Sequence, residues 1–144
     1  LVPHFSGEES IMGHSMGGHG ALVVGMKNPT RFKAISAFAP ILCPSQAPWG
    51  IKAFTAYLGE DLSFWKAWDA AELVKEVNIP PILIMQGTQD NFYPKHLDET
   101  LFLENAKQHN QSLLYKKMEG YDHSYFFIAS FLEDHFAFHM KHFK

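Results

Sequence analysis

Residues 10–22 read SIMGHSMGGHGAL, and the rest of the chain can be interpreted around this stretch. At its centre, residues 13–17 have the pattern Gly-x-Ser-x-Gly, which is typical of a short apolar strand that turns sharply into a helix of small residues. The two glycines lack a Cβ atom, so we expect strand and helix to pack closely around a strained Ser15. Such a turn exposes the Ser15 hydroxyl, which can then act as a nucleophile. A glycine-rich loop with no catalytic role can, however, have the same five-residue pattern.

The residue after this serine is expected to contribute a backbone donor. Met16 falls in the first turn of the expected helix, where amides have no partner within the helix and lie at the positive end of its dipole. The sequence therefore predicts that the N–H of Met16 stabilises an oxyanion next to Ser15.

The composition is that of a globular protein. The 144 residues are 47% hydrophobic, and we expect a single domain over residues 1–144. The net charge is −3 and the basic residues are scattered, so nothing favours nucleic acid or an anionic membrane as a partner. No apolar run approaches the ~20 residues of a membrane span. The single cysteine, Cys43, is expected to be a small buried group and fits a reducing compartment such as the cytoplasm.

Apolar segments alternate with helical patterns along the chain. Strands are expected at residues 10–13, 33–39, 82–86 and 112–118, and helices at residues 16–27, 94–109 and 125–143, with short helical patterns over residues 62–77. Ser63 and Pro94 are expected in the first turns of two of these helices, residues 41–59 are expected to be irregular, and Pro3 is expected to break a helix end. The alternation predicts an α/β fold with a mostly parallel sheet, helices on both faces and right-handed crossovers.

Three residues with catalytic potential follow three of these strands. Ser15 follows the first, Asp90 the third and His123 the fourth, and functional groups in an open parallel sheet gather at the carboxyl ends of the strands. A serine hydroxyl needs a base, which His123 can supply, and an acid such as Asp90 can orient the imidazole. Asp122 is the rival acid, but it is adjacent to the histidine and poorly placed to reach its Nδ1 atom.

A metal site is the less favoured interpretation of the nine histidines. His135, His139 and His142 lie on one predicted helix at spacings of four and three, but the glutamate of the His-Glu-x-x-His pattern is absent. We expect these three side chains to be partly exposed and not to bind a metal ion.

Other polar and aromatic residues have simpler interpretations. Asp69 and Asp98 lie in helical patterns and are interpreted as surface charges, while His14 and His19 are expected to pack or hydrogen-bond locally. Trp49 follows a predicted strand in a loop, so it either belongs to the core or lines the site that holds the acyl group of a substrate.

Together these motifs resemble S-formylglutathione hydrolases, the esterase D family of α/β-hydrolases. The resemblance is carried by residues 13–22 (GHSMGGHGAL), 36–40 (SAFAP), 48–50 (PWG), 57–59 (YLG) and 120–125 (GYDHSY). It implies Ser15 as nucleophile, Asp90 as acid and His123 as base, with Met16 at the oxyanion and Trp49 in the pocket. It also implies hydrolysis of S-formylglutathione to glutathione and formate in formaldehyde detoxification, side activity on short-chain carboxylesters, a cytoplasmic location, no cofactor and often a homodimer.

The resemblance covers only the C-terminal half of such proteins. The chain starts at Leu1 without a signal peptide or an initiator methionine, so we expect it to begin in mid-fold. The N-terminal strands and the loop with the second oxyanion donor are then absent. This predicts about four strands, with the strand before Ser15 at an edge, and a chain that is weakly active or dependent on a partner.

Two alternatives remain open for the function. The first is a broader carboxylesterase of the same fold. The second is a catalytically impaired fragment that acts only as a binding module and keeps the serine turn as structure.

Overall fold

The computed structural model describes residues 6–144, so the expectation for Pro3 lies outside the described residues. Within this range, four strands form one parallel sheet in the order β1-β2-β3-β4. They are β1 (Glu9–His14), β2 (Phe32–Phe38), β3 (Ile82–Gly87) and β4 (Leu113–Met118). Right-handed crossovers in this order put the connecting helices on one face of the sheet. The predicted α/β fold with a parallel sheet is therefore confirmed.

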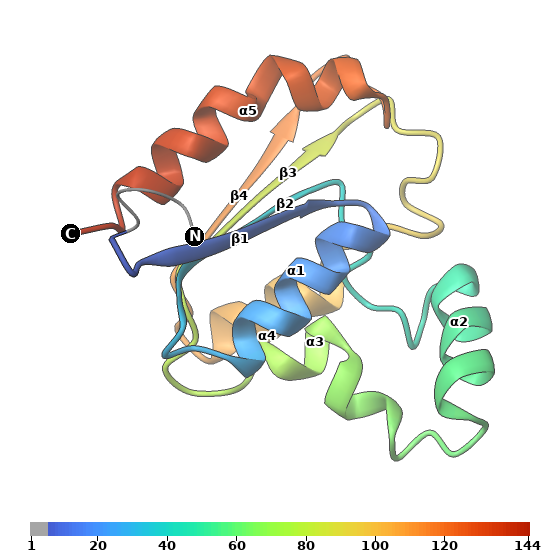
Figure 1. The fold of residues 1–144 in the computed structure, drawn as a ribbon. Helices are drawn as coiled ribbons and strands as arrows, with labels where there is room; N and C mark the ends of the chain where they lie inside the picture. Colours follow the sequence, from blue (N-terminus) through green and yellow to red (C-terminus); the bar gives the residue numbers. More distant parts are fainter. Residues whose placement is uncertain (1–5) are drawn as a thin grey trace.

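Helices cover both faces of this sheet (Figure 1). On one face lie α1 (Met16–Lys27), α3 (Ala70–Leu73) and α4 (Thr100–Gln108), and on the other lies α5 (Tyr125–Met140). The helix α2 (Pro48–Leu58) stands away from the sheet, and a 3₁₀ helix, η1 (Trp65–Trp68), precedes α3.

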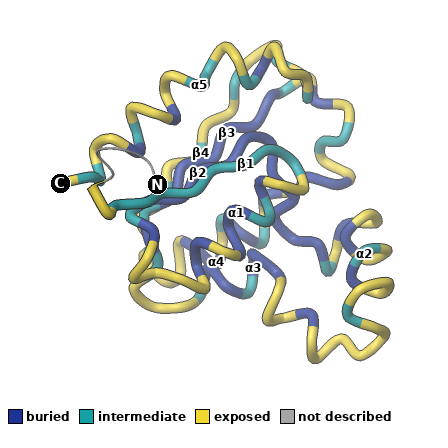
Figure 2. Tube along the Cα trace, in the orientation of Figure 1, coloured by how far each residue is buried: buried dark blue, intermediate teal, exposed yellow. Residues whose placement is uncertain are grey.

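The inner strands separate two apolar cores. β2 and β3 are buried along almost their whole length, whereas β1 and β4 are more accessible (Figure 2). Ile82 and Ile84 of β3 belong to the core under α1, α3 and α4, while Leu83 and Met85 pack in the core that includes Phe127 of α5. Burial on both faces explains why this strand is continuously apolar.

The strand that leads to Ser15 lies at an edge of the sheet. Among the described residues β1 pairs only with β2, and all six of its residues are half-buried. Its outer side therefore presents backbone N–H and C=O groups that have no strand partner, as the sequence predicted for this strand.

The expectation of an irregular segment at residues 41–59 is wrong for its second half, which forms α2. Proline is compatible with the first turn of a helix, and Pro48 is the first residue of α2. Gly50 is required by space, because a Cβ atom there would lie 2.2 Å from the carbonyl oxygen of Pro44.

Two helix starts also differ from the prediction. The helix expected from Pro94 begins at Thr100, whose N–H donates to the exposed Asp98 carboxylate at 2.7 Å.

Asp69, interpreted as a surface charge, is buried and caps α3 by accepting from the N–H of Ala71 at 2.9 Å. A buried carboxylate is tolerated here because it accepts backbone hydrogen bonds, a contact that the local pattern does not reveal. The expected cap at Ser63 is likewise wrong, because no helix begins at that residue.

The expectation that the histidines of the last helix are partly exposed is wrong for two of them. His135 and His139 are 0% and 3% exposed, and both lie within 2.8 Å of the Ser36 hydroxyl of β2. The His135 ring also stacks on Phe38, with ring centroids 3.6 Å apart. The α5 face that covers the sheet is thus partly polar, and an apolar pattern alone does not identify it.

This buried cluster makes stability depend on pH. Burial, with a further effect of neighbouring positive charge, lowers the pKa of His135 to about 3 and that of His139 to about 4, from an ordinary value of 6.5. The unfolded chain therefore binds protons more readily than the folded chain. The stability that these neutral rings contribute is fully present above pH 6.5 and is lost as the pH falls toward 4 and then 3.

We predict a loss of about 2 kcal/mol per buried ring between pH 6.5 and pH 5, measured as the free energy of urea unfolding. The variant His135→Phe keeps an aromatic ring against Phe38 and should show a smaller loss than the native chain. The exposed His109→Gln is the matched control and should lose as much as the native chain. An unchanged loss in His135→Phe would contradict the prediction.

Candidate active site

Ser15 lies between β1 and α1 in a strained backbone conformation. Its φ and ψ angles are 57° and −119°, a region in which a non-glycine residue costs about 1–3 kcal/mol. Its N–H donates to the carbonyl of Phe38 at 2.8 Å, and its own carbonyl accepts from the N–H groups of His19 and Ile41 at 3.0 and 3.3 Å. The end of β2 and the first turn of α1 therefore hold the serine in this conformation.

The glycines around Ser15 do not contribute equally. A Cβ atom on Gly13 would lie 2.1 Å from the carbonyl oxygen of Gly17, so Gly13 is required where strand and helix meet. Gly17 itself has no atom within 4 Å of such a Cβ, and the expectation of close packing at both flanking glycines is wrong for it. The second crowded position is Gly18, where a Cβ would lie 3.0 Å from the side chain of Pro40.

The predicted acid and base lie in contact at the carboxyl ends of β3 and β4. His123 Nδ1 is 2.6 Å from Asp90 Oδ2, and the Asp90 side chain is fully buried. Asp122, the rival acid, is exposed and instead accepts from the N–H of Ser124 at 2.9 Å. The structure thus brings together Asp90 and His123, and not Asp122 and His123.

The His123 ring is packed between two aromatic side chains. His14 lies on it with ring centroids 4.5 Å apart, and Phe92 contacts it edge-on at 4.9 Å. Within residues 6–144 no hydrogen bond joins the Ser15 hydroxyl to this imidazole, although both residues follow the carboxyl ends of parallel strands. Such hydrogen bonds often shorten only when substrate binds.

Asp90 is held ionised by three donors. Burial acts to raise the pKa of Asp90, but hydrogen bonds from His123, from the N–H of Phe92 at 2.9 Å and from Gln86 at 3.0 Å outweigh it, so the pKa lies below the usual value. Sequence reasoning missed Gln86. The available signal was a single polar residue at the end of an otherwise apolar strand.

The histidines next to Ser15 pack locally, as expected. Burial lowers the pKa of both His14 and His19, and the positive form of His123 lowers that of His14 further. The ring of His14 also lies near Tyr125, and that of His19 near Phe54. Both rings are therefore held neutral. Burial similarly raises the pKa of the Cys43 thiol to about 11, and this residue is buried as predicted.

An apolar cavity of about 300 Å³ opens beside Ser15. It is lined by Ser15, Met16, His19, Ile41, Pro44, Trp49, Gly50, Ala53 and Phe54. Trp49 is half-exposed and stacks on His96, with ring centroids 4.1 Å apart. The structure therefore places Trp49 on α2, and not in the expected loop, where it lines the same cavity as Ser15.

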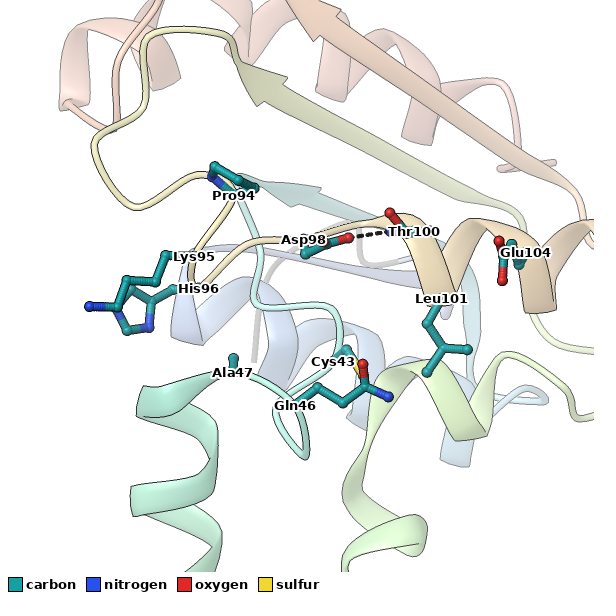
Figure 3. Close-up of a pocket in the computed structure, with 10 residues that line it drawn as sticks. All are labelled: Cys43, Gln46, Ala47, Pro94, Lys95, His96, Asp98, Thr100, Leu101 and Glu104. Atoms are coloured by element: carbon teal, nitrogen blue, oxygen red, sulfur yellow. Dashed lines mark hydrogen bonds between the residues drawn. The ribbon is translucent and has the colours of Figure 1, made fainter.

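A larger cavity of about 460 Å³ lies elsewhere, between residues 43–47 and residues 94–104 (Figure 3). Its lining is mixed and includes Lys95, Asp98 and Glu104, and it contains none of the predicted catalytic side chains. His96 lines this cavity and stacks on Trp49, so the two cavities lie on either side of that contact.

The parallel sheet with a strained serine after its first strand defines an α/β-hydrolase fold. The family model named Esterase matches residues 3–138, and the chain belongs to this family. An S-formylglutathione hydrolase from Agrobacterium tumefaciens is 44% identical, with a TM-score of 0.92 over 97% of this chain and 51% of that one. S-formylglutathione hydrolase FrmB from Staphylococcus aureus is 21% identical (TM-score 0.68; 88% of this chain, 52% of that one). Esterase B from Lactobacillus rhamnosis is 18% identical (TM-score 0.73; 93% and 53%), and these last two show the fold alone.

The chain spans about half the length of these structures. In the part that the structure describes, no helix is long and apolar enough to cross a membrane. The same residues hold no group of three side chains placed to bind a metal ion.

The unequal glycines lead to a prediction. Gly13→Ala should destabilise the chain by about 3 kcal/mol or more and displace Ser15, because its Cβ would overlap a backbone oxygen that cannot move away independently. Gly17→Ala is the matched control. It should keep the fold or stabilise α1 by roughly 0.5–1 kcal/mol, because alanine favours helix over glycine. Urea unfolding of both variants measures the difference, and equal destabilisation would contradict the packing described above.

Proposed function

We propose that the chain carries the catalytic triad of a serine hydrolase, with Ser15 as nucleophile, His123 as base and Asp90 as acid. The 2.6 Å contact between His123 Nδ1 and Asp90 Oδ2 is the observation that carries the proposal. With its Nδ1 atom held in this way, the imidazole has Nε2 available to take the proton of the Ser15 hydroxyl and later to return it to the leaving group. The ionised Asp90 stabilises the imidazolium formed between these steps.

The N–H of Met16 is the proposed oxyanion donor. Met16 is the first residue of α1, where an amide has no acceptor within the helix, and its N–H follows directly on Ser15. Removal of one oxyanion donor typically costs about 100- to 1,000-fold in turnover. A second donor to the same oxyanion would therefore strongly affect turnover.

The proposed substrate is the thioester S-formylglutathione, which would be cleaved to glutathione and formate. The 44% identity to the Agrobacterium tumefaciens S-formylglutathione hydrolase supports this substrate. Ser15 would attack the formyl carbon and release the thiolate of glutathione, which leaves a formyl ester on Ser15. Water would then hydrolyse this ester to formate and restore the serine hydroxyl. A thiol ionises near pH 8.5, so its thiolate leaves with less assistance from an acid than an alkoxide needs. A role in formaldehyde detoxification, a cytoplasmic location and a homodimer remain predictions of this assignment.

The apolar cavity favours a second candidate, a broader carboxylesterase of the same fold, whereas the first candidate would have only side activity on short-chain carboxylesters. A cavity of 150 Å³ is large enough to bind benzene, and the one beside Ser15 measures about 300 Å³. A formyl group would leave most of this volume empty, whereas an acyl chain of several carbons would bury apolar surface there.

Covalent labelling with a fluorophosphonate tests whether the chain has a reactive serine at all. We expect a mass increase that is lost in Ser15→Ala. Asp90→Asn should slow labelling by up to about 10⁴-fold, the cost of replacing this acid in a Ser-His-Asp triad, because the imidazole loses its orientation. Asp122→Asn is the matched control and should label at the native rate. A folded chain without an adduct would favour the binding module over the hydrolase, and equal rates in the two variants would remove Asp90 from the triad.

The substrate is tested by comparing kcat/KM for S-formylglutathione with that for a short-chain aryl ester. Preference for the thioester supports the narrow assignment, and much faster cleavage of the ester supports the broader carboxylesterase.

Trp49 offers a further prediction about the acyl group. Trp49→Ala should enlarge the cavity and raise the ratio of kcat/KM for p-nitrophenyl hexanoate to that for the acetate by about 10-fold, since each methylene buried in an apolar pocket is worth that order. Trp68→Ala is the matched control, because Trp68 is also 45% exposed but lies outside the cavity against Lys27. Equal ratios in both variants would show that Trp49 does not shape the acyl site.

A further inference from the structure

Gln86 is a buried polar residue in the apolar strand β3, at the end of the strand from which the Asp90 loop starts. It is 2% exposed, and its neighbours Leu83, Ile84 and Met85 are buried apolar residues. An amide in such surroundings is costly unless its polar atoms find partners. Its contacts therefore indicate why a glutamine is present here.

The direction of the Gln86 amide follows from its two acceptors. Nε2 lies 3.1 Å from the carbonyl oxygen of Gly87 and 3.0 Å from Asp90 Oδ2. A carbonyl oxygen and an ionised carboxylate can only accept hydrogen bonds, so the group facing both must be the NH₂ and not the amide oxygen. Each of its two N–H bonds then has one acceptor.

Gln86 and the catalytic imidazole share one oxygen of Asp90. Oδ2 accepts from Gln86 at 3.0 Å and from His123 Nδ1 at 2.6 Å, while Oδ1 accepts from the backbone of Phe92 at 2.9 Å. The Gln86 amide is the one side-chain donor to this carboxylate, apart from the imidazole itself, that the described residues provide. This hydrogen bond fixes the orientation of the carboxylate. It also partly screens the negative charge of Oδ2, which would otherwise act on the imidazole alone.

We propose that Gln86 is a positioning residue that holds the Asp90 carboxylate toward His123 and widens the pH range of the site at its acid end. The inference rests on the proposed triad. Without this amide, the negative charge of Oδ2 would act on the imidazole alone. The Asp90–His123 pair would therefore retain its proton up to a higher pH. The base would then be unavailable over part of the pH range in which the native site works.

The variant Gln86→Met tests this role, because methionine has a similar shape and no donor. We expect the acid limb of the pH profile for fluorophosphonate labelling of Ser15 to move upward by about half to one pH unit, part of what a hydrogen bond to a charged group is worth. Gln89→Met is the matched control. Gln89 is an exposed residue of the same loop, has no hydrogen bond to Asp90 and should leave the profile unchanged.

A purely structural role for Gln86 gives a different result. If Gln86→Met lowers the unfolding temperature but leaves the acid limb in place, the proposal is wrong. If this variant fails to fold, Gln86→Glu replaces it with nearly the same shape. Its carboxylate, once ionised next to Asp90, lacks a donor and adds negative charge beside the Asp90–His123 pair, so it should move the limb in the same direction.

A second measurement separates this proposal from the proposed function. The proton on His123 Nδ1, hydrogen-bonded to Asp90, should give a downfield NMR resonance in the native chain and in Gln89→Met, and this resonance should move in Gln86→Met. The resonance does not require turnover. Absence of labelling together with a moved resonance would overturn the hydrolase and keep the role of Gln86, whereas an unmoved resonance would overturn the role of Gln86 itself.

Discussion

The hydrogen bond from the N–H of Ser15 to the carbonyl of Phe38 is the constraint on which the candidate site depends. It ties a strained residue of an edge strand to the end of the most deeply buried part of the sheet. Positive φ at a non-glycine residue persists only where the surroundings impose it. Here the surroundings are β2, the first turn of α1 and the space left by Gly13, so the reactivity proposed for Ser15 is a property of the whole sheet.

The parallel arrangement of the strands supplies the other half of the site. Because the strands are parallel, the carboxyl ends of β3 and β4 lie on the same side of the sheet as that of β1. The loops that follow β3 and β4 place Asp90 and His123 in contact, although these residues are 33 positions apart in the sequence. The imidazole is then fixed by one hydrogen bond and by two rings, His14 and Phe92. The helix α2 also reaches these contacts, because its Trp49 packs against Phe92 with ring centroids 4.7 Å apart, and it lines the space beside the serine.

The sequence predicted those parts of the structure that depend on local chemistry. The bounds of α1, the four strands and the order of Ser15, Asp90 and His123 follow from apolar periodicity and turn residues. It did not predict features that depend on distant partners. Asp69 is buried because the backbone of Ser45 and Ala71 satisfies it, and Gly50 of α2 lies against the backbone of Pro44. His135 and Gln86 are buried for the same kind of reason, since the hydroxyl and the carboxylate that they contact come from other segments.

The Ser36 hydroxyl between His135 and His139 has a consequence for the positions of single protons. A hydroxyl carries one hydrogen, so it can donate to one ring nitrogen while it accepts from the other. His135 Nδ1 and His139 Nε2 lie 2.8 Å from the same oxygen, so at least one of them must carry a hydrogen. If the hydroxyl donates to one ring, the other ring must donate to the hydroxyl. If both rings donate, the oxygen accepts twice through its two lone pairs. The positions of the protons under α5 are thus linked across two elements, because the form of each ring restricts the form of the other.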